Sequence, residues 1–340
     1  MIKYNKIQKN TLLVVDSTDR GLLFPPFAVI LYTKSAQKEI IMDMLHITDL
    51  HKKFGDKEVL NGLSLAVPEH SIYGFIGKNG SGKTTTMKTV LGLLKPDSGE
   101  ITVNGERVVY GQTATNKYIG YLPDVPEFYS FMTATEYLRF CGEISGIVGA
   151  DNDARVAELL TLVGLADEKH RIKGFSRGMK QRLGIAQALL NKPKLLICDE
   201  PTSALDPVGR REILDILSSV RDQTTVLFST HILSDVERIC TDVAFLNNGV
   251  IEIQGKLADI KARFRGNEYQ IQTENEADIL TILSFFTGMK RTDATRVIFR
   301  EGDYNVADVL RFVADNGISI VKIERMELGL EELFMEVNGK

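Results

Sequence analysis

The chain is poor in cysteine and has no tryptophan: three cysteines occur in 340 residues. Cys141, Cys198 and Cys240 are far apart in the sequence and odd in number. This spacing matches no metal-binding motif and argues against a framework of disulfides. We therefore expect buried, reduced thiols of the kind found in cytosolic proteins.

Long hydrophobic runs and an excess of positive charge are also lacking. The best candidate for a membrane span, Leu22 to Tyr32, is broken by Pro25-Pro26 and is far shorter than the roughly 20 residues that a spanning helix needs. The formal net charge is -4, so no basic field indicates a nucleic-acid partner. If the protein works at a membrane, we expect it to do so through another chain.

Residues 1–43 form a candidate N-terminal extension, because the segment from Met1 to Ile41 has no clear hydrophobic period. Met42 and Met44 stand directly before a strand-like run, Leu45 to Leu50. One hypothesis is that translation starts at one of these methionines and that the earlier residues are upstream read-through. The alternative is a genuine, poorly ordered extension.

Strand-like and helical patterns alternate over residues 44–265. Leu63, Leu65 and Val67 alternate as in a half-buried strand, and Asn104-Gly105 predicts a tight hairpin turn between residues 101–103 and 107–109. Further strands are predicted at 45–50, 72–76, 194–198, 225–228, 243–246 and 250–254. The order predicts an α/β fold whose mixed sheet has an antiparallel part.

Two predicted helices in this region show apolar faces at helical spacing. One carries Met87, Val90, Leu91 and Leu94. The other follows a capping box of Thr133 and Glu136, and its predicted apolar face holds Tyr137, Phe140, Cys141 and Ile144. After Arg265 the pattern changes, and residues 266–340 predict a small α+β domain with strands at 269–271, 297–299 and 318–323 and helices at 277–286 and 306–313.

The segment Gly77-x-x-x-x-Gly82-Lys83-Thr84 matches the phosphate-binding P-loop. Its glycines let successive backbone N–H groups point into one concavity that holds phosphate oxygens. Lys83 is predicted to reach the β- and γ-phosphates, and the hydroxyl of Thr84 to ligate Mg²⁺. The predicted nucleotide-binding residues of this loop are Gly77, Asn79, Gly80, Ser81, Gly82, Lys83, Thr84 and Thr85.

Two carboxylates, Asp199 and Glu200, end an apolar strand. Ligands of open α/β sheets bind at the carboxyl ends of the strands. We expect Asp199 to hold Mg²⁺ and Glu200 to polarise the attacking water, because positioning dominates phosphoryl transfer. His231 follows another predicted strand, at the same edge. Its neutral imidazole suits a hydrogen bond to the γ-phosphate, although a lone histidine is more often structural.

Between these motifs lies Phe175-Ser176-Arg177-Gly178-Met179-Lys180-Gln181-Arg182. This run resembles the signature motif of the ATP-binding cassette (ABC) family, and the resemblance covers about Leu45 to Gln254. It implies an ABC-type P-loop NTPase domain over residues 44–265, with a helical subdomain at about 125–190. It also implies ATP and Mg²⁺ as cofactors, and catalysis by Glu200, His231 and Lys83.

The family pattern assigns further roles by resemblance alone. Phe54 is the aromatic on which adenine stacks, with a core aromatic as the alternative. Ser176 and Gly178 contact the γ-phosphate held by an opposite subunit, with a helix N-terminus directed at the anion. Ser203 to Asp206 resembles the loop that crosses the dimer interface. Together these roles imply a dimer closed around two nucleotides.

Two positions depart from the commonest family pattern. Asp124, in Tyr121-Leu122-Pro123-Asp124, stands where the family usually has glutamine, and it retains the ability to bind Mg²⁺ or water. Arg177 stands where a glycine is commoner, and it either adds a charge near the nucleotide or faces solvent. Both departures resemble a bacterial branch that drives exporters of drugs and antibiotic peptides.

The segment Glu127 to Met132 is rich in aromatics. In the family, this region meets the membrane subunit, and local packing inside the helical subdomain is the alternative. The leading hypothesis is the ATPase subunit of an exporter, peripheral on the cytoplasmic face of the cell membrane. Its partners are an integral-membrane permease and a second ATPase subunit, in a homodimer or a closely related heterodimer. The alternatives are a soluble ABC ATPase acting on nucleic acid or ribosomes, and a non-catalytic ATP-binding regulatory module.

Overall fold

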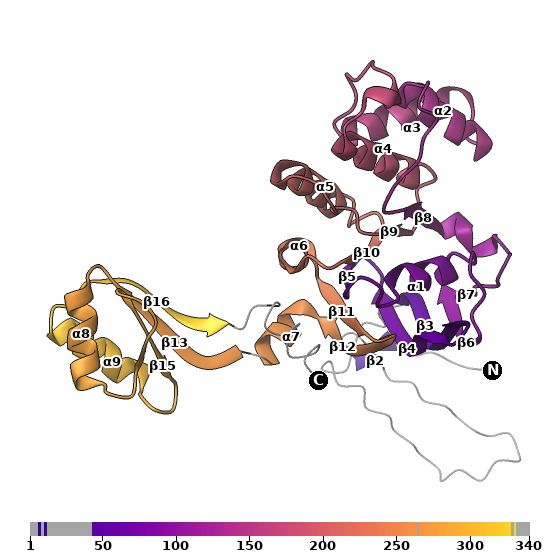
Figure 1. Cartoon of the computed structure of the whole chain (residues 1–340). Coiled ribbons are helices and arrows are strands. Elements are labelled where there is room, and N and C mark those ends of the chain that lie inside the picture. The colour runs from indigo at the N-terminus through magenta and orange to yellow at the C-terminus, as the bar shows by residue number, and fades with distance from the viewer. Residues whose placement is uncertain (1–5, 8–9, 12–42, 264, 328–329, 331–340) are drawn as a thin grey trace, which may run out of the picture. The chain divides into compact units, whose positions relative to one another are not determined.

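The computed structural model describes residues 6–7, 10–11, 43–263, 265–327 and 330 (Figure 1). The chain divides into two units, Met1–Met42 and Asp43–Lys340. In the first unit, β1 (Lys6–Ile7) pairs antiparallel with β2 (Asn10–Thr11). The expectations about residues 1–43 otherwise lie almost wholly outside the described residues, and they stay predictions.

A six-stranded mixed sheet forms the centre of the second unit, with the order β12-β11-β5-β10-β9-β8. Its strands are β5 (Ile72–Ile76), β8 (Ile119–Leu122), β9 (Leu195–Cys198), β10 (Thr225–Thr230), β11 (Asp242–Asn247) and β12 (Val250–Lys256). Five of them run parallel, and β12 pairs antiparallel with β11. The predicted α/β fold with a mixed sheet is therefore confirmed.

Side chains of the central strands alternate between two hydrophobic clusters, one on each face. On β9, Leu196 and Cys198 face one cluster, which also holds residues of the helical subdomain. Leu195 and Ile197 face the other, which is shared with an antiparallel sheet. Since both faces are covered, these strands read as continuous apolar runs. This double burial holds the strand ends firmly, and the functional loops leave from those ends.

The antiparallel sheet has the order β4-β3-β6-β7 and comprises β3 (Asp43–Phe54), β4 (Lys57–Pro68), β6 (Ser98–Val103) and β7 (Glu106–Arg107). Leu63, Leu65 and Val67 are buried, as their alternation predicted. Asn104 and Gly105 both have positive φ, 50° and 77°, in the turn between β6 and β7. The hairpin is confirmed, although β7 ends at Arg107, before the predicted limit at residue 109.

Seven α-helices and two 3₁₀ turns are described between residues 43 and 263. They are α1 (Lys83–Val90), η2 (Ala114–Tyr118), α2 (Ala134–Ile144), α3 (Gly149–Leu162), η3 (Ile172–Gly174), α4 (Arg177–Leu189), α5 (Pro207–Ser219), α6 (Leu233–Ile239) and α7 (Leu257–Arg263). None of the helices in the described ranges is long and apolar enough to cross a membrane. Figure 1 shows α2, α3 and α4 grouped together as the predicted helical subdomain.

Local sequence signals set the ends of two helices. The capping box at Thr133 is present, with both hydrogen bonds to Glu136. The predicted apolar face of α2 is wrong at its end, because Ile144 is 71% exposed and Leu138 is buried instead. Helix α1 is also shorter than its pattern predicted. Gly92 adopts a left-handed conformation (φ 69°) just after the helix, and this conformation ends it before Leu94.

Residues 265–327 form a separate four-stranded antiparallel sheet, ordered β14-β15-β13-β16. Its elements are β13 (Arg265–Thr273), α8 (Glu276–Phe285), β14 (Lys290–Arg291), β15 (Arg296–Arg300), α9 (Val306–Asp315) and β16 (Ile320–Glu327). The βαββαβ sequence with this strand order is the ferredoxin-like arrangement. Both helices and one face of the sheet share an apolar core that includes Ile271, Ile279, Val297 and Val309. The predicted α+β character is confirmed.

Candidate nucleotide-binding site

The strand order places the predicted site residues at one edge of the sheet. Strand β10 lies between β5 and β9 and runs parallel to both. The glycine-rich loop follows β5, Asp199 and Glu200 follow β9, and His231 follows β10. An open cleft of about 340 Å³ lies at this edge. It is lined by Val59, Asn79, Gly80, Gly82, Lys83, Thr84, Thr85, Asp124, Asp199, Glu200, Ser203 and His231.

The glycine-rich loop is built for an anion. Gly80 and Gly82 have φ of 82° and 112°, which favours glycine. A Cβ at Gly77 would come within 2.5 Å of Ser81 Oγ, so a side chain there would displace the loop. Gly82 is the N-cap of α1 and offers no side-chain cap, and the buried Ser81 Oγ has no hydrogen-bond partner. Free N–H groups at a helix N-terminus and an unused hydroxyl fit phosphate oxygens.

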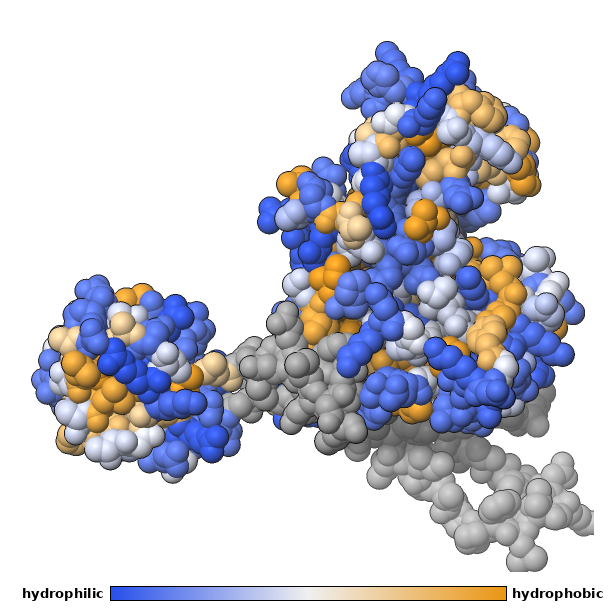
Figure 2. Space-filling view, viewed as in Figure 1, coloured by the Kyte–Doolittle hydropathy of each residue, from blue (hydrophilic) through white to orange (hydrophobic). Residues whose placement is uncertain are grey.

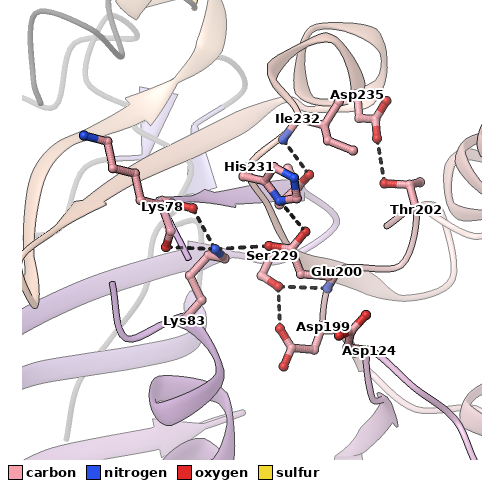
Figure 3. Close-up of polar contacts among 12 residues, drawn as sticks. Lys78, Lys83, Asp124, Asp199, Glu200, Thr202, Ser229, His231, Ile232 and Asp235 are labelled. Carbon is pink, nitrogen blue, oxygen red and sulfur yellow. Dashed lines mark hydrogen bonds and ion pairs between the residues drawn. The ribbon is translucent and has the colours of Figure 1, made fainter. Parts of the chain in front are cut away.

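Lys83 is buried at the start of α1, and its ammonium group lies inside the loop (Figure 3). Nζ donates to the carbonyl oxygens of Gly77 at 2.6 Å and Lys78 at 3.3 Å. It also lies 3.1 Å from Glu200 Oε1. That ion pair lacks hydrogen-bond alignment, since Oε1 has no hydrogen-bond partner. The lysine is therefore held in place by the loop carbonyls and by the charge of Glu200.

Asp199 accepts hydroxyl hydrogen bonds on both of its oxygens. Thr84 Oγ1 donates to Oδ2 at 2.7 Å, and Ser229 Oγ donates to Oδ1 at 2.6 Å. Asp199 is only 3% exposed, and two donors compensate much of the cost of burying its charge. Two of the three predicted magnesium ligands, Thr84 and Asp199, thus lie in direct contact.

Glu200 is held between the loop lysine and the histidine. Its Oε2 lies 3.0 Å from His231 Nδ1, and its side chain is only 12% exposed. Its backbone has φ of 49°, a left-handed conformation that costs a non-glycine residue about 1–2 kcal/mol. Strained residues of this kind occur mainly where function requires a fixed geometry. His231 is 44% exposed and lines the cleft, so it faces the ligand side of Glu200.

Asp124 and Arg177, the two departures from the family pattern, contact each other. Arg177 Nη2 lies 3.7 Å from Asp124 Oδ1. Asp124 also lines the cleft, and its Oδ1 is buried without a hydrogen-bond partner. Gln181 Nε2 donates to the carbonyl oxygen of Asp124 at 2.8 Å. Helix α4 is therefore attached to the loop that enters the cleft.

The signature residues do not line the cleft of their own chain. Ser176 is the N-cap of α4 and accepts from the Met179 backbone N–H at 3.2 Å. A Cβ at Gly178 would meet no atom within 4 Å, so nothing in the described fold requires glycine there. This end of α4 is open to an outside ligand.

Phe54 lies at the end of β3 and outside the cleft-lining set. The residue is 50% exposed, and the Lys52 ammonium group lies 5.4 Å from the centroid of its ring. The alternative that Phe54 is a core aromatic is therefore wrong. Adenine stacking stays a prediction.

Part of the aromatic segment packs inside the helical subdomain and part of it is exposed, while contact with a membrane subunit stays a prediction. Phe128 packs edge to face on Tyr137, 5.1 Å between centroids. Tyr129 and Phe131 are 51% and 62% exposed, and their ring centroids lie 5.9 Å apart. Figure 2 shows hydrophobic atoms gathered over the helical subdomain.

Sequence reasoning missed three polar contacts beside the site. Ser229 also accepts from the Glu200 backbone N–H at 2.9 Å. Thr202 donates to Asp235 Oδ2 at 2.6 Å, and Arg210 pairs with Oδ1 at 2.7 Å. These partners lie 25 to 33 residues apart, so no local motif marks them. The signal available was the position of Ser229 two residues before His231, on a strand next to β9.

Neighbouring titratable groups are held neutral. Burial raises the pKa of the Cys198 thiol well above its ordinary value, with a further contribution from Asp199. Burial and the nearby Asp199 raise the pKa of Tyr121 to about 12. Cys198 is therefore an inert thiol, as the spacing of the cysteines suggested, and Tyr121 stays protonated.

The donor set suits a hard cation. Thr84, Asp199 and Asp124 offer only oxygen atoms, the ligands that Mg²⁺ prefers, and Mg²⁺ in nucleotide sites takes one or two carboxylates together with substrate phosphates. Within the described residues, no group of three or more His, Cys, Asp or Glu side chains forms a metal site by itself. The residues present thus fit a cation that arrives with a phosphate ligand.

Comparison with known proteins gives two family matches. Residues 60–203 match the ABC transporter family, and residues 255–338 match the C-terminal domain of DrrA1-3-like ATP-binding proteins. The chain is 37% identical over 297 residues to the uncharacterized ABC transporter ATP-binding protein YxlF of Bacillus subtilis (strain 168), covering 86% of this chain and 99% of that protein. It is 37% identical over 303 residues to the bacitracin transport ATP-binding protein BcrA of Bacillus licheniformis, covering 87% and 97%.

A solved structure of an ATP-binding subunit of an ABC transporter is also similar. It has a TM-score of 0.58 and 33% identity, and the match covers 65% of this chain and 93% of that one. Together, the fold and the loop of Lys83 define a P-loop ATPase. The matches go further: the chain belongs to the ATP-binding proteins of ABC transporters, and it is a nucleotide-binding ATPase subunit. The likeness to BcrA and the DrrA-like C-terminus agree with the branch that the Asp124 and Arg177 departures indicated.

Proposed function

We propose that two copies of this chain, or this chain and a close relative, close head to tail around two Mg-ATP. The observation that carries the proposal is the position of the signature segment. Ser176 and Gly178 lie outside their own chain's cleft, at a helix N-terminus with open space beside Gly178. A helix N-terminus attracts an anion, and a second subunit's γ-phosphate is the anion that the family arrangement supplies.

Within each cleft, different residues of the chain bind the phosphates, bind Mg²⁺ and orient the attacking water. The loop N–H groups and Lys83 hold the phosphates, and Thr84, Asp199 and Asp124 would hold Mg²⁺. Bound there, Mg²⁺ would neutralise charge on the phosphate oxygens. Glu200 orients the attacking water and accepts its proton, since it is fixed between Lys83 and His231. His231 donates from Nε2 to the γ-phosphate. Because a neutral imidazole has one N–H, this donation requires either that both ring nitrogens carry protons or that Nδ1 gives up its contact with Glu200.

We further propose that the closing motion drives export of an antibiotic peptide or a similar compound through a separate membrane permease, on the cytoplasmic face of the membrane. The similarity to BcrA, named for bacitracin transport, supports this substrate class. The exposed aromatics Tyr129 and Phe131 supply an apolar surface suited to such a partner. ATPase activity that responds to DNA or ribosomes, and not to a permease, would contradict this choice.

The Glu200→Gln variant tests the sandwich. Removing the water-orienting carboxylate leaves the phosphate cradle, so this variant should bind ATP, hydrolyse it at least about 100-fold more slowly, and elute as a dimer in gel filtration with saturating ATP. A Glu200→Gln protein that stays monomeric contradicts the proposal.

Gly178 provides a matched control for the same experiment. In the Glu200→Gln background, Gly178→Ala should still dimerise, because its Cβ meets nothing in the monomer. Gly178→Asp should stay monomeric while binding ATP normally, because its charge repels a phosphate brought by the other subunit. Equal dimerisation of both variants would remove Gly178 from the interface.

A further inference from the structure

Ser229 stands at the centre of the polar contacts behind the cleft. It is the second-last residue of β10, fully buried, and does not line the cleft. Figure 3 shows its hydroxyl between the Asp199 carboxylate and the backbone nitrogen of Glu200. Because Ser229 cannot touch a nucleotide from this position, any effect on catalysis must pass through its two partners.

The direction of the hydrogen bonds around Ser229 is fixed by chemistry. An ionised Asp199 only accepts, so Thr84 and Ser229 both direct their hydroxyl protons to it, at 2.7 and 2.6 Å. The lone pairs of Ser229 Oγ are then free to accept the Glu200 backbone N–H, at 2.9 Å. The result is a chain of contacts that runs from Thr84 through Asp199 and Ser229 to the backbone of Glu200.

This chain ends at a strained residue. Glu200 adopts φ of 49°, and such a conformation persists only where surrounding contacts determine it. The serine fixes the N–H side of that residue. The side chain then leaves toward Lys83 and His231, at 3.1 and 3.0 Å. Without the hydroxyl, the buried N–H loses its partner and Asp199 loses one of two donors.

We propose that Ser229 is a positioning residue for ATP hydrolysis. Its hydroxyl links the Asp199 carboxylate to the backbone N–H of Glu200. The orientation of Asp199 thereby helps to fix the backbone of Glu200, and so the position of the Glu200 carboxylate that orients the water. The inference rests on the assignment of Glu200 as the group that orients the water. A purely structural role, in which Ser229 only satisfies a buried amide, predicts a loss of stability without a selective loss of kcat.

Two variants of equal size separate these roles. Ser229→Thr keeps the hydroxyl, and Ser229→Val replaces it with a methyl group in the same volume. We expect kcat to fall about 10- to 100-fold in Ser229→Val, the range typical of residues that orient ligands from behind. Ser229→Thr should retain most of kcat, and KM and the equilibrium affinity for ATP should change little in both. Equal kcat values for the two variants would overturn the proposal.

Two further arms cover failure of the bulkier variants to fold. Ser229→Ala adds no volume, and it should show the same loss of kcat at unchanged ATP affinity; a kcat within about twofold of the unchanged protein also overturns the proposal. In the Glu200→Gln background, Ser229→Ala should have no further effect, because residues that act through one group are not additive. An additional loss there indicates a separate role. If the Glu200→Gln protein fails to dimerise in gel filtration, that result contradicts only the proposed ATP sandwich. The tests of Ser229 compare rates of ATP turnover, so they are read separately.

Discussion

The nucleotide cleft and the ferredoxin-like unit differ in how many polar side chains they bury. Around the cleft, Lys83, Asp199, Thr202, Ser229 and Asp235 are all buried polar groups, and each has a partner among its neighbours. In the part of residues 265–327 whose side chains are described, Thr273 is the one buried polar residue. The core of this C-terminal unit is otherwise apolar, and its ion pairs, such as Arg300 with Glu268, lie at the surface.

The difference shows where folding alone explains the sequence. Burying polar and charged groups costs free energy unless they are paired, and replacing them with apolar groups often stabilises a protein. The C-terminal unit avoids this cost, because its core is almost entirely apolar. The edge formed by β9 and β10 does not avoid it, and also contains the strained Glu200. The cleft edge therefore combines buried, paired polar groups with a residue of positive φ, which fits the site that the motifs indicate.

The largest expected effect comes from removing the loop lysine. Lys83→Ala deletes the donor to the loop carbonyls and the cation that we propose holds the phosphates, so ATP binding should be lost and hydrolysis should fall by at least about 10³-fold. Lys78→Ala is the matched control, because that lysine belongs to the same loop but its side chain points away from the cluster (Figure 3). Isothermal calorimetry and a phosphate-release assay measure both. Comparable losses in the two variants would mean that the charge of the loop matters more than the position of Lys83.

The second prediction asks whether the ferredoxin-like unit is uncoupled from catalysis. Ile271 is fully buried in its core, so Ile271→Ala should cost about 2–5 kcal/mol of stability. ATP affinity and kcat of the folded protein should not change. Ile298 is the control: it lies on the neighbouring strand and on the other face of the sheet, opposite Gln270, and is only partly buried. Thermal unfolding and ATPase assays on both variants provide the test, and a lower kcat in Ile271→Ala alone would show that the two regions are coupled.

Sequence predicted those features that depend on neighbouring residues. The Asn104-Gly105 turn, the capping box at Thr133 and the loop of Lys83 all occupy short segments whose chemistry is local. What it missed depends on pairing across the sheet. Ser229 reaches Glu200 only because β10 lies beside β9, and the mark it carried in the sequence was its place two residues before His231.

Two further outcomes also depend on tertiary contacts that local patterns do not show. The exposure of Ile144 could not be predicted, because helical spacing shows an apolar face but not its limits. The strand order of the C-terminal unit was likewise beyond the pattern, which indicates strands but not their partners.

The smallest expected effect concerns the pair that joins the two departures from the family pattern. Arg177 and Asp124 are 46% and 48% exposed and 3.7 Å apart, so their coupling in a double-mutant cycle should be only about 0.2–1 kcal/mol and should weaken with salt. The cycle uses Arg177→Gln and Asp124→Asn, and urea unfolding gives the free energies. The Arg300–Glu268 pair, at 3.0 Å on the surface of the other region, provides the matched cycle.

Nucleotide distinguishes the two pairs. Asp124 lines the cleft, and its Oδ1, which faces Arg177, has no hydrogen-bond partner, so ATP with Mg²⁺ should draw the carboxylate away from Arg177 and abolish the coupling. The Arg300–Glu268 coupling should be unchanged by the same addition. If the Arg177–Asp124 coupling persists in ATP, the pair is an ordinary surface ion pair like Arg300–Glu268. In that case Asp124 does not contact the bound nucleotide or its cation.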